Sequence, residues 1–334
     1  LMKKFFFPTI SYLLILLQML FANPAFSDNQ INLVDYKDTV DEITRILINK
    51  HKVDSNYVKK ALGEIKIRKK TIDSMNNAAE RKATWKRYKN IFITKNTISK
   101  GINYHKENYK VLKEIEKKYG VPSEVIVAIL GVETKYGKGT GKIKVLDSLG
   151  TLAFLHPRRS KLFKSQLISF IILSYKNNLN YNEIYGSYAG AMGTPQFMPE
   201  SYIKYGVDYD QDGSVDLWNS KHDIYASVAN YLIKKGWKKG QPIYNNIEIK
   251  KEYISEIFKT GDVKTIPIED EFLNKILVGN KNLYNGKKYL ALLSKNNKEY
   301  KLVYKNFKVI MTYNISTFYA MVVATLSEKV SIKK

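Results

Sequence analysis

The sequence predicts an α+β fold that is mainly α, and three observations lead to this prediction. Residues 125–132 contain no polar side chain, which is typical of a helix buried on all sides. Residues 31–118 repeat apolar side chains at helical spacing. Residues 241–311 change character and contain short β-prone runs. With 334 residues the chain is long enough to build a sizeable core in two or three lobes.

The first segment, residues 1–27, has the pattern of an export signal. Lys3 and Lys4 precede an apolar stretch at 10–21, and small residues at 25–27 suit cleavage. The stretch is shorter than the ~20 residues that cross a bilayer, so we expect no stable membrane span after signal removal. An uncleaved anchor is the alternative. The chain has no cysteine, which excludes disulfides, thiol chemistry and a lipid-anchor cysteine.

Four parts are expected behind the signal. They are an N-terminal helical lobe (28–118), a core that carries the chemistry (119–240), a small β-rich lobe (241–311) and a C-terminal helix (312–334).

Apolar spacing in the first of these parts predicts helices at 33–48 and 57–65. A charged helix at 104–119 should follow and end at Gly120, because glycine commonly terminates helices.

The β-rich lobe and the last helix follow from a change in pattern. Residues 300–304 and 307–311 are β-prone runs, and two asparagines at 296–297 predict a turn before them. From Asn314 a capped apolar helix, 318–326, is expected to pack back on the N-terminal helices.

The net charge of +24 comes mainly from lysine, since only six of the 55 basic residues are arginines. A lysine excess together with many asparagines and isoleucines is typical of a biased genome, and an exported protein does not meet nucleic acid. We therefore expect no nucleic-acid partner. An exported cationic protein should still be attracted to an anionic envelope polymer, with strong salt dependence.

Glu133 is the strongest candidate for chemistry. Pro122 and Ser123 are helix-start residues, and the apolar helix that they begin ends in this carboxylate. Burial and the negative end of the helix both disfavour ionisation, so we expect the Glu133 pKa to be raised. A general acid that works near neutral pH needs such a pKa. The alternative is a glutamate that turns outward to water.

A glycine-rich segment at 185–202 is the second candidate. Its small residues could let a ligand approach the backbone, while Ser187 and Gln196 place a hydroxyl and an amide among aromatic side chains. Such a mixture can orient sugars. Tight packing on small residues is the alternative.

An aspartate-rich loop at 208–219 matches the calcium loop of an EF-hand. Oxygen donors occupy loop positions 1, 3, 5, 7 and 9, and Gly213 occupies position 6. Position 12 is Asn219 instead of glutamate, and Asp223 could complete the shell. We expect a structural calcium ion; a solvated acidic turn is the alternative. The predicted ligands are Asp208, Asp210, Asp212, Ser214, Asp216 and Asp223.

Arg158 and Arg159 follow His156 and are the only adjacent arginines. Their forked guanidinium groups suit carboxylate or phosphate, with a surface pair as the alternative. The four histidines are scattered and give no metal-binding spacing.

Taken together, these segments resemble the B-type family of lytic murein transglycosylases, which have a lysozyme-like core. The resemblance covers about residues 30–330. The matching motifs are Gly131-Val132-Glu133-Thr134, Pro157-Arg158-Arg159, Gly186 to Gly193, Gln196-Phe197-Met198-Pro199, the aspartate loop up to Trp218, Thr84 to Tyr88, Ala229-Asn230-Tyr231, and Tyr313-Asn314 with Tyr319. The departures are Asn219 in the calcium loop and Thr194 in the 193–196 turn.

The resemblance implies cleavage of peptidoglycan between N-acetylmuramic acid and N-acetylglucosamine without addition of water. Glu133 matches the single catalytic acid of the family. The positions that match glycan-binding residues are Ser187, Gln196, Tyr88, Arg158, Arg159, Tyr231, Tyr313, Asn314 and Tyr319. Peptidoglycan glycan strands are the implied partner, no organic cofactor is implied, and a soluble monomer in the periplasm is expected.

The acid inventory agrees with a single-acid mechanism. Ordinary glycosidases pair two carboxylates, about 5 Å apart for retention or about 6.5–9.5 Å apart for inversion. The other acids between 125 and 200 are Asp147, Glu183 and Glu200, none in a comparable apolar setting. Two alternatives stay open: a hydrolytic muramidase, and a non-catalytic protein of the envelope that binds peptidoglycan.

Overall fold

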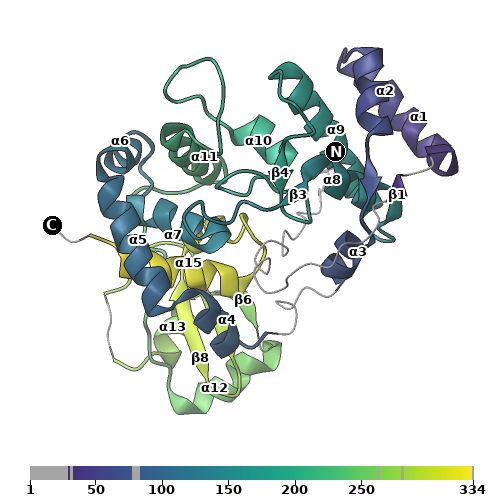
Figure 1. The fold of residues 1–334 in the computed structure, drawn as a ribbon. Helices are drawn as coiled ribbons and strands as arrows, with labels where there is room; N and C mark the ends of the chain where they lie inside the picture. Colours follow the sequence, from purple (N-terminus) through teal and green to yellow (C-terminus); the bar gives the residue numbers. More distant parts are fainter. Residues whose placement is uncertain (1–28, 31–32, 77–82, 262, 280–281, 333–334) are drawn as a thin grey trace, which may run out of the picture.

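The structure is a computed structural model that describes residues 29–30, 33–76, 83–261, 263–279 and 282–332. Helices dominate, and antiparallel strands form one small lobe and two short ribbons, as Figure 1 shows. The predicted signal at 1–27 lies outside the described residues. Among the described helices, none is both long enough and apolar enough to cross a membrane.

The chain begins with a ribbon and three helices. The helices are α1 (Lys37–Arg45), continued by the π-helical turn η2 (Ile46–Lys50), α2 (Ser55–Gly63) and α3 (Lys69–Asn76), preceded by the 3-10 turn η1 (Leu33–Tyr36). Strands β1 (Asn29–Gln30) and β2 (Lys66–Ile67) pair antiparallel. Both helices predicted from apolar spacing in this part are therefore present. Arg68 ties the part to the core, since its Nε lies 3.0 Å from the buried Asp147 carboxylate.

The charged helix predicted at 104–119 is wrong as one element. The structure has α4 (Trp85–Phe92), α5 (Lys95–Glu107) and α6 (Tyr109–Tyr119), with a break at Asn108. The Asn108 side chain donates to the carbonyl of Tyr104 at 2.7 Å, and local side-chain bonds of this kind compete with the helical pattern. Gly120 ends α6 in the left-handed conformation, as predicted.

At the centre lies α7 (Ser123–Thr134), and only Glu124 among its residues is not buried. It is surrounded by α5, α6, α11 (Lys221–Lys234) and α15 (Thr317–Val330). Ser123 lies in the first turn but does not cap it; its hydroxyl instead lies 3.1 Å from Nε2 of His105. The helix starts at Ser123, as the two helix-start residues predicted.

A second group of helices flanks α7. It contains α8 (Val145–Leu155), α9 (Ser160–Lys176) and α10 (Pro199–Tyr205), with α8 against α9 and α10 between α9 and α11. The ribbon of β3 (Ile143–Lys144) and β4 (Tyr185–Gly186) joins the start of α8 to the glycine-rich segment.

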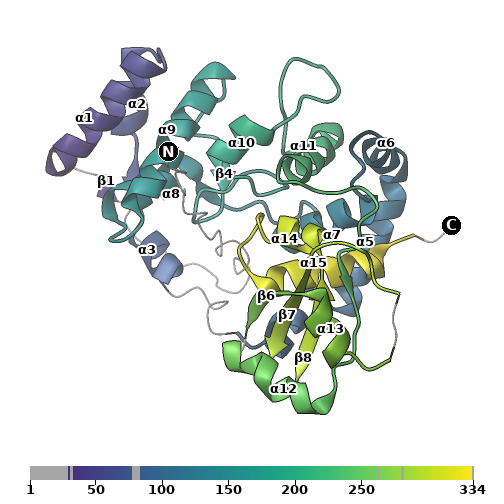
Figure 2. The ribbon, with the colours of Figure 1, turned by 180° about the vertical axis from the view of Figure 1, so that it is seen from behind.

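The small lobe is a four-stranded antiparallel sheet in the order β5-β8-β7-β6. Its strands are β5 (Tyr244–Asn245), β6 (Lys264–Ile268), β7 (Lys288–Ser294) and β8 (Glu299–Val303). Three helical segments accompany them: α12 (Lys251–Ile257), η4 (Phe258–Thr260) and α13 (Asp270–Ile276). The sheet has its own apolar core and is placed below α14 (Lys305–Ile310) and α15 in Figure 2.

One of the two predicted strands in this lobe is correct. The run at 300–304 forms β8, and a turn covers 295–298 as expected. The run at 307–311 is instead mostly helix α14, so the prediction of a strand there is wrong. Phe307, Val309 and Ile310 are all buried, and a helix rather than an alternating strand places adjacent residues such as the last two against one core.

The last helix, α15, contacts α7, α5 and α4 and thus meets both the central helix and the N-terminal region. Its cap is Ser316, whose Oγ accepts from the backbone N–H of Tyr319 at 3.3 Å. Most of α15 is buried, so Tyr319 enters the interior from a rigid element.

Candidate active site

Glu133 lies at the last turn of α7 with 4% of its surface exposed. The outward-facing alternative therefore does not hold. Its Oε1 accepts a hydrogen bond of 2.6 Å from the hydroxyl of Tyr319, which α15 supplies from 186 residues along the chain. The contact is between two buried groups, so solvent does not weaken it.

Tyr319 is held in its neutral form. Burial raises its pKa well above the ordinary value, and the negative charge of Glu133 raises it further. A neutral phenol can donate but cannot act as a base at physiological pH. The pair therefore consists of one acid and one fixed donor.

Two further predicted tyrosines continue from this pair. The ring of Tyr313 stacks on Tyr319, with centroids 6.3 Å apart and planes 10° apart. Tyr231 meets Tyr313 edge to face at 4.9 Å. Their hydroxyls donate to backbone carbonyls, Tyr313 to Pro195 at 2.6 Å and Tyr231 to Thr312 at 2.5 Å. The structure thus brings Glu133, Tyr319, Tyr313 and Tyr231 into one chain of contacts.

Two further predicted residues, Tyr88 and Asn314, lie near these tyrosines: Tyr88 acts electrostatically on Tyr319, and Asn314 directly follows Tyr313. Tyr88, from α4, packs on Phe318 at 5.7 Å and adds to the electrostatic surroundings of Tyr319. The outer face of α4 carries an open hollow that contains none of the predicted site residues. Asn314 is 3% exposed, and its Oδ1 has no hydrogen-bond partner in the described part of the chain. A buried amide oxygen without a partner is available to a ligand donor.

The glycine-rich segment reaches Glu133 through Thr134. The Thr134 hydroxyl donates to the carbonyl of Thr194 at 2.9 Å, so the residue after Glu133 is fixed to the 193–196 turn. Gln196 closes that turn with φ +52°, and its amide donates to the carbonyls of Thr140 and Gly193. Sequence reasoning assigned Thr134 no role, although a hydroxyl directly after a catalytic candidate was visible.

Ser187 is fully buried, and its hydroxyl oxygen accepts from the backbone N–H groups of Ala189 and Ala191. The neighbouring Gly186 is packed against the chain itself: a Cβ there would lie 2.2 Å from the carbonyl oxygen of Ala191. At Gly186 the packing alternative therefore holds, because backbone and not ligand occupies the space. The Ser187 hydroxyl hydrogen can still be donated.

Arg158 and Arg159 lie in the turn between α8 and α9, and Arg159 directly precedes α9. Nδ1 of the buried His156 accepts from both backbone N–H groups at 3.2 Å. Arg158 is exposed and Arg159 is half-buried. His156 thus shapes the turn that presents the two arginines.

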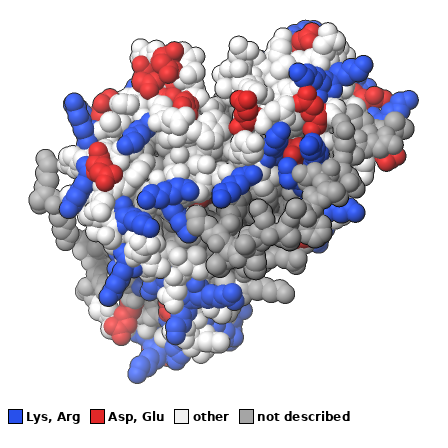
Figure 3. Space-filling model, viewed as in Figure 1, with Lys and Arg blue, Asp and Glu red and all other residues white. Residues whose placement is uncertain are grey.

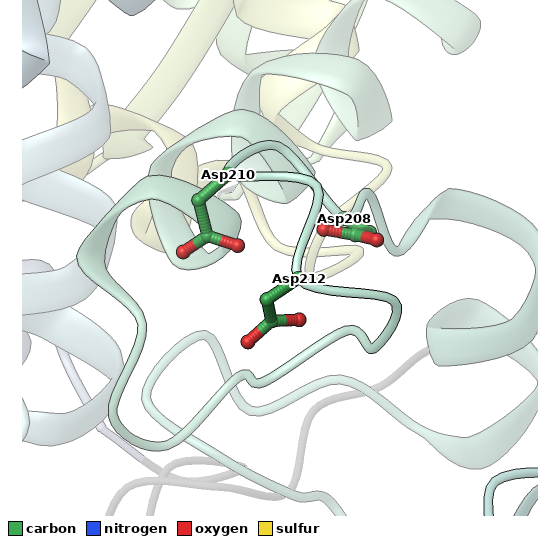
Figure 4. A group of neighbouring side chains, drawn as sticks. All are labelled: Asp208, Asp210 and Asp212. Carbon is green, nitrogen blue, oxygen red and sulfur yellow. The ribbon is translucent and has the colours of Figure 1, made fainter.

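Three carboxylates of the aspartate loop lie close to one another. One carboxylate oxygen from each of Asp208, Asp210 and Asp212 lies within 4.8 Å of the others, and Figure 4 shows the three groups bordering one space. Oδ1 of Asp208 is buried without a hydrogen-bond partner among the described residues. Oxygen donors gathered in this way fit a hard divalent cation such as calcium.

The other predicted ligands shape the loop. Ser214 donates to Asp212 at 2.9 Å, and Asp216 accepts from the backbone of Trp218. Asp223 is fully buried; it accepts from the backbone N–H of Tyr209 at 2.7 Å and of Asp216 at 2.8 Å. Burial, and then the nearby acidic groups of the loop, raise the Asp223 pKa. Ligation by these three residues stays a prediction.

A model of the transglycosylase SLT domain matches residues 35–328. The chain belongs to this family. It is 32% identical over 308 residues to the membrane-bound lytic murein transglycosylase B of Escherichia coli, covering 86% of this chain and 81% of that protein. The resemblance found in the sequence is therefore confirmed, and so is the activity class, a lytic transglycosylase.

Two solved structures show the same fold. One is the catenated lytic transglycosylase SltB1 of Pseudomonas aeruginosa, with a TM-score of 0.80, 33% identity and coverage of 87% of this chain and 96% of that chain. The other is the E. coli lytic transglycosylase Slt35 in complex with calcium, with a TM-score of 0.77, 31% identity and coverage of 87% and 92%. The predicted fold class, mainly α with a lysozyme-like core and a small sheet, is confirmed.

Proposed function

We propose that this lytic transglycosylase cleaves the MurNAc-β-1,4-GlcNAc bond of peptidoglycan and leaves 1,6-anhydro-MurNAc ends. The observation that carries the proposal is the buried Glu133 carboxyl, which accepts a hydrogen bond from the hydroxyl of Tyr319. A carboxyl in this setting suits a group that gives a proton and later takes one back. Membership of the family supports the assignment.

The absence of a second suitable acid in the described core favours substrate assistance. Of the other acids between 125 and 200, Asp147 is bound to Arg68, Glu200 accepts from Gln166, and Glu183 is exposed. Asp147 is as buried as Glu133 but is paired with the Arg68 guanidinium, and Glu183 and Glu200 are exposed. The substrate must then supply the nucleophile that a second carboxylate supplies in retaining glycosidases.

In the first step Glu133 protonates the bridging oxygen, and the carbonyl oxygen of the muramoyl 2-acetamido group attacks its own anomeric carbon as the glycosidic bond breaks. In the second step the C6 hydroxyl attacks the same carbon and the acetamido oxygen leaves. Glu133, now ionised, accepts the proton of the C6 hydroxyl. Both attacks are intramolecular, which gives a high effective molarity. Tyr319 stabilises the carboxylate between the two steps by donating to Oε1.

The remaining predicted contacts have separate roles in this proposal. Ser187 would donate to the acetamido group, and Asn314 and Gln196 would orient the sugars. The arginines at 158 and 159 would bind lactyl and peptide carboxylates. Tyr88, Tyr231 and Tyr313 would form the aromatic wall beside the glycan.

We further propose that calcium binds the loop around Asp208, Asp210 and Asp212 and acts structurally. The related Slt35 is known in complex with calcium, and the buried partnerless oxygen of Asp208 fits a cation ligand. When bound, the ion would neutralise charge repulsion in the loop. It has no part in the proton transfers assigned to Glu133.

We place the activity in the periplasm, where the signal predicted at 1–27 would deliver the chain. The net charge of +24 supports attraction to anionic peptidoglycan. Basic side chains are spread over the face shown in Figure 3, while acidic ones gather in a few places.

The first test is Glu133→Gln, which keeps the shape of the side chain but removes the transferable proton. Loss of both proton transfers should reduce lysis of purified sacculi by at least about 10³-fold. Binding to sacculi, measured by co-sedimentation, should stay unchanged. Glu183→Gln, an exposed carboxylate in the same region, is the matched control and should lyse like the wild type.

Full lysis by Glu133→Gln would assign the acid elsewhere. A wild-type protein that binds sacculi without any turnover would instead be a non-catalytic envelope protein.

A further inference from the structure

The chain leaves α7 through an unusual backbone conformation. Lys135 and Tyr136 have φ of +52° and +63°, and both are residues with a Cβ in the left-handed region. Their N–H groups close the helix by bonding to the carbonyls of Gly131 and Leu130, each at 3.1 Å. Glycine normally occupies such a position after a helix. Two consecutive left-handed residues persist only where surrounding contacts hold them, and such strain clusters at functional sites.

Tyr136 supplies the contacts that hold this exit. It is 8% exposed, and its hydroxyl donates to the carbonyl of Thr97 in α5 at 2.9 Å. A Cβ on Gly131 would lie 2.6 Å from its ring, and a Cβ on Gly101 would lie 2.4 Å from its hydroxyl oxygen. Two glycines, one in each helix, thus make room for the ring. Tyr136 is therefore wedged between the catalytic helix and α5.

Tyr136 lies three residues after Glu133, and Thr134, between them, is held by hydrogen bonds of its own. The Thr134 hydroxyl accepts from the N–H of Gly137 at 3.0 Å while it donates to Thr194. The direction of the last turn of α7 therefore depends on where residues 135–137 lead the chain. Glu133 must meet Tyr319 at 2.6 Å from that turn.

We propose that Tyr136 is a positioning residue for Glu133. Its ring and hydroxyl hold the left-handed exit, and the exit fixes the last turn of α7 so that the carboxyl points at Tyr319 and the scissile bond. The proposal rests on the proposed function, in which Glu133 is the acid. Misplacement of a catalytic group by about 1 Å can reduce a rate about 100-fold, so the effect should appear in kcat.

The test compares Tyr136→Leu with Tyr225→Leu. The rings of Tyr136 and Tyr225 both contact the ring of Tyr104, with centroids 5.4 Å and 6.3 Å away. Tyr225 is a matched control because it is fully buried in α11 and donates to the Tyr104 hydroxyl but does not belong to the exit from α7. Both variants should lower Tm. Only Tyr136→Leu should lower kcat on solubilised glycan strands, by about tenfold or more, with KM within about twofold of the wild type. Wild-type kcat in Tyr136→Leu, or an equal kcat loss in both variants, would overturn the proposal.

A milder pair covers the case in which a leucine variant does not fold. Tyr136→Phe keeps the ring and loses only the bond to Thr97, and Tyr225→Phe loses only the bond to Tyr104. A kcat loss confined to Tyr136→Phe supports positioning; no loss, or the same loss in both, refutes it. Glu133→Gln is run beside them: if it keeps turnover, the proposed function has failed, whereas if only the Tyr136 comparison fails, the role of Glu133 stands.

Discussion

At the scale of single residues, the contact between Glu133 and Tyr319 defines the site. Both groups are buried, and the 2.6 Å bond lets the phenol stabilise the ionised carboxylate. The burial that excludes water also keeps Tyr319 neutral, because it raises the pKa of the phenol well above its ordinary value. The donor is therefore permanent over the physiological pH range. Such a donor favours the carboxylate after the first proton transfer without competing for the proton.

The raised pKa of Tyr319 predicts how stability changes in alkali. Below the ordinary tyrosine pKa of about 10 the folded and unfolded states both keep the proton, so Tyr319 causes no pH dependence. Above it the unfolded state loses the proton while the folded state keeps it. The free energy of unfolding then falls by up to about 1.4 kcal/mol per pH unit. Tyr319→Phe should remove this contribution from urea unfolding curves recorded between about pH 9 and about pH 11.

The control for this prediction is Phe318→Leu. It disturbs packing next to Tyr319 but removes no titratable group, so it should lower stability equally at all these pH values. If the free energy of unfolding falls equally steeply with pH in Tyr319→Phe and in the wild type, Tyr319 is not a buried neutral phenol in the folded protein.

At this scale the sequence indicated Glu133 as the candidate acid and, through the family resemblance, named Tyr319, but it did not predict the hydrogen bond between them. An apolar helix that ends in a carboxylate is visible in the sequence because burial on all sides leaves no polar face. The donor from Tyr319 depends on how α15 docks, and the left-handed conformation of Lys135 and Tyr136 depends on two glycines in different helices. No local pattern contains that information.

At the scale of elements, hydrogen bonds to α6 and α11 hold the loop between α10 and α11 in place. Asp223 binds the loop backbone from α11, and Tyr209 donates to Glu114 of α6 at 2.9 Å. The ammonium of Lys118 lies 4.1 Å from the Tyr209 ring. Burial and the bond to Glu114 raise the Tyr209 pKa to about 12, so this link also stays intact at neutral pH. Inside the loop the carboxylates of Asp208, Asp210 and Asp212 lie close together, and their like charges repel one another.

We therefore expect calcium to raise Tm and a chelator to lower it. At a free calcium concentration about 100 times Kd the stabilisation should be about 2.7 kcal/mol. Asp210→Asn and Asp212→Asn weaken binding because each removes a charged ligand. Their Tm should therefore respond less to calcium.

Asp38→Asn is the control, since Asp38 is an exposed acid of α1 far from the loop in the chain. A wild-type Tm that chelator does not change would rule out a calcium site in this loop.

The elements themselves were predicted unevenly, for physical reasons. The helices at 33–48 and 57–65 were predicted from apolar spacing alone, whereas the break at Asn108 depends on one side-chain hydrogen bond. Residues 307–311 have strand propensity but form helix α14, because burial against the core outweighs local preference. Strands β6 and β7 were not predicted, since their pairing is a long-range contact.

At the scale of the whole molecule, α15 connects the parts. It contacts α4 and α5 of the N-terminal region, α7 of the core and strand β7 of the small lobe. The Oγ1 atom of Thr265, in β6, lies 3.0 Å from Oγ1 of Thr317. Thr317 stands two residues before Tyr319 in α15. Helix α15, which carries Tyr319, is thus held in place by the N-terminal region, the core and the small lobe. In the mechanism that we propose, this arrangement keeps Glu133 buried and aligned for both proton transfers.

The central claim is that water takes no part in the reaction, and digestion of purified peptidoglycan in ¹⁸O-labelled water tests it most directly. We expect muropeptides with 1,6-anhydro ends, one water lighter than hydrolysis products and free of ¹⁸O. Products one water heavier that carry ¹⁸O at the new reducing end would show a hydrolytic muramidase and contradict the account.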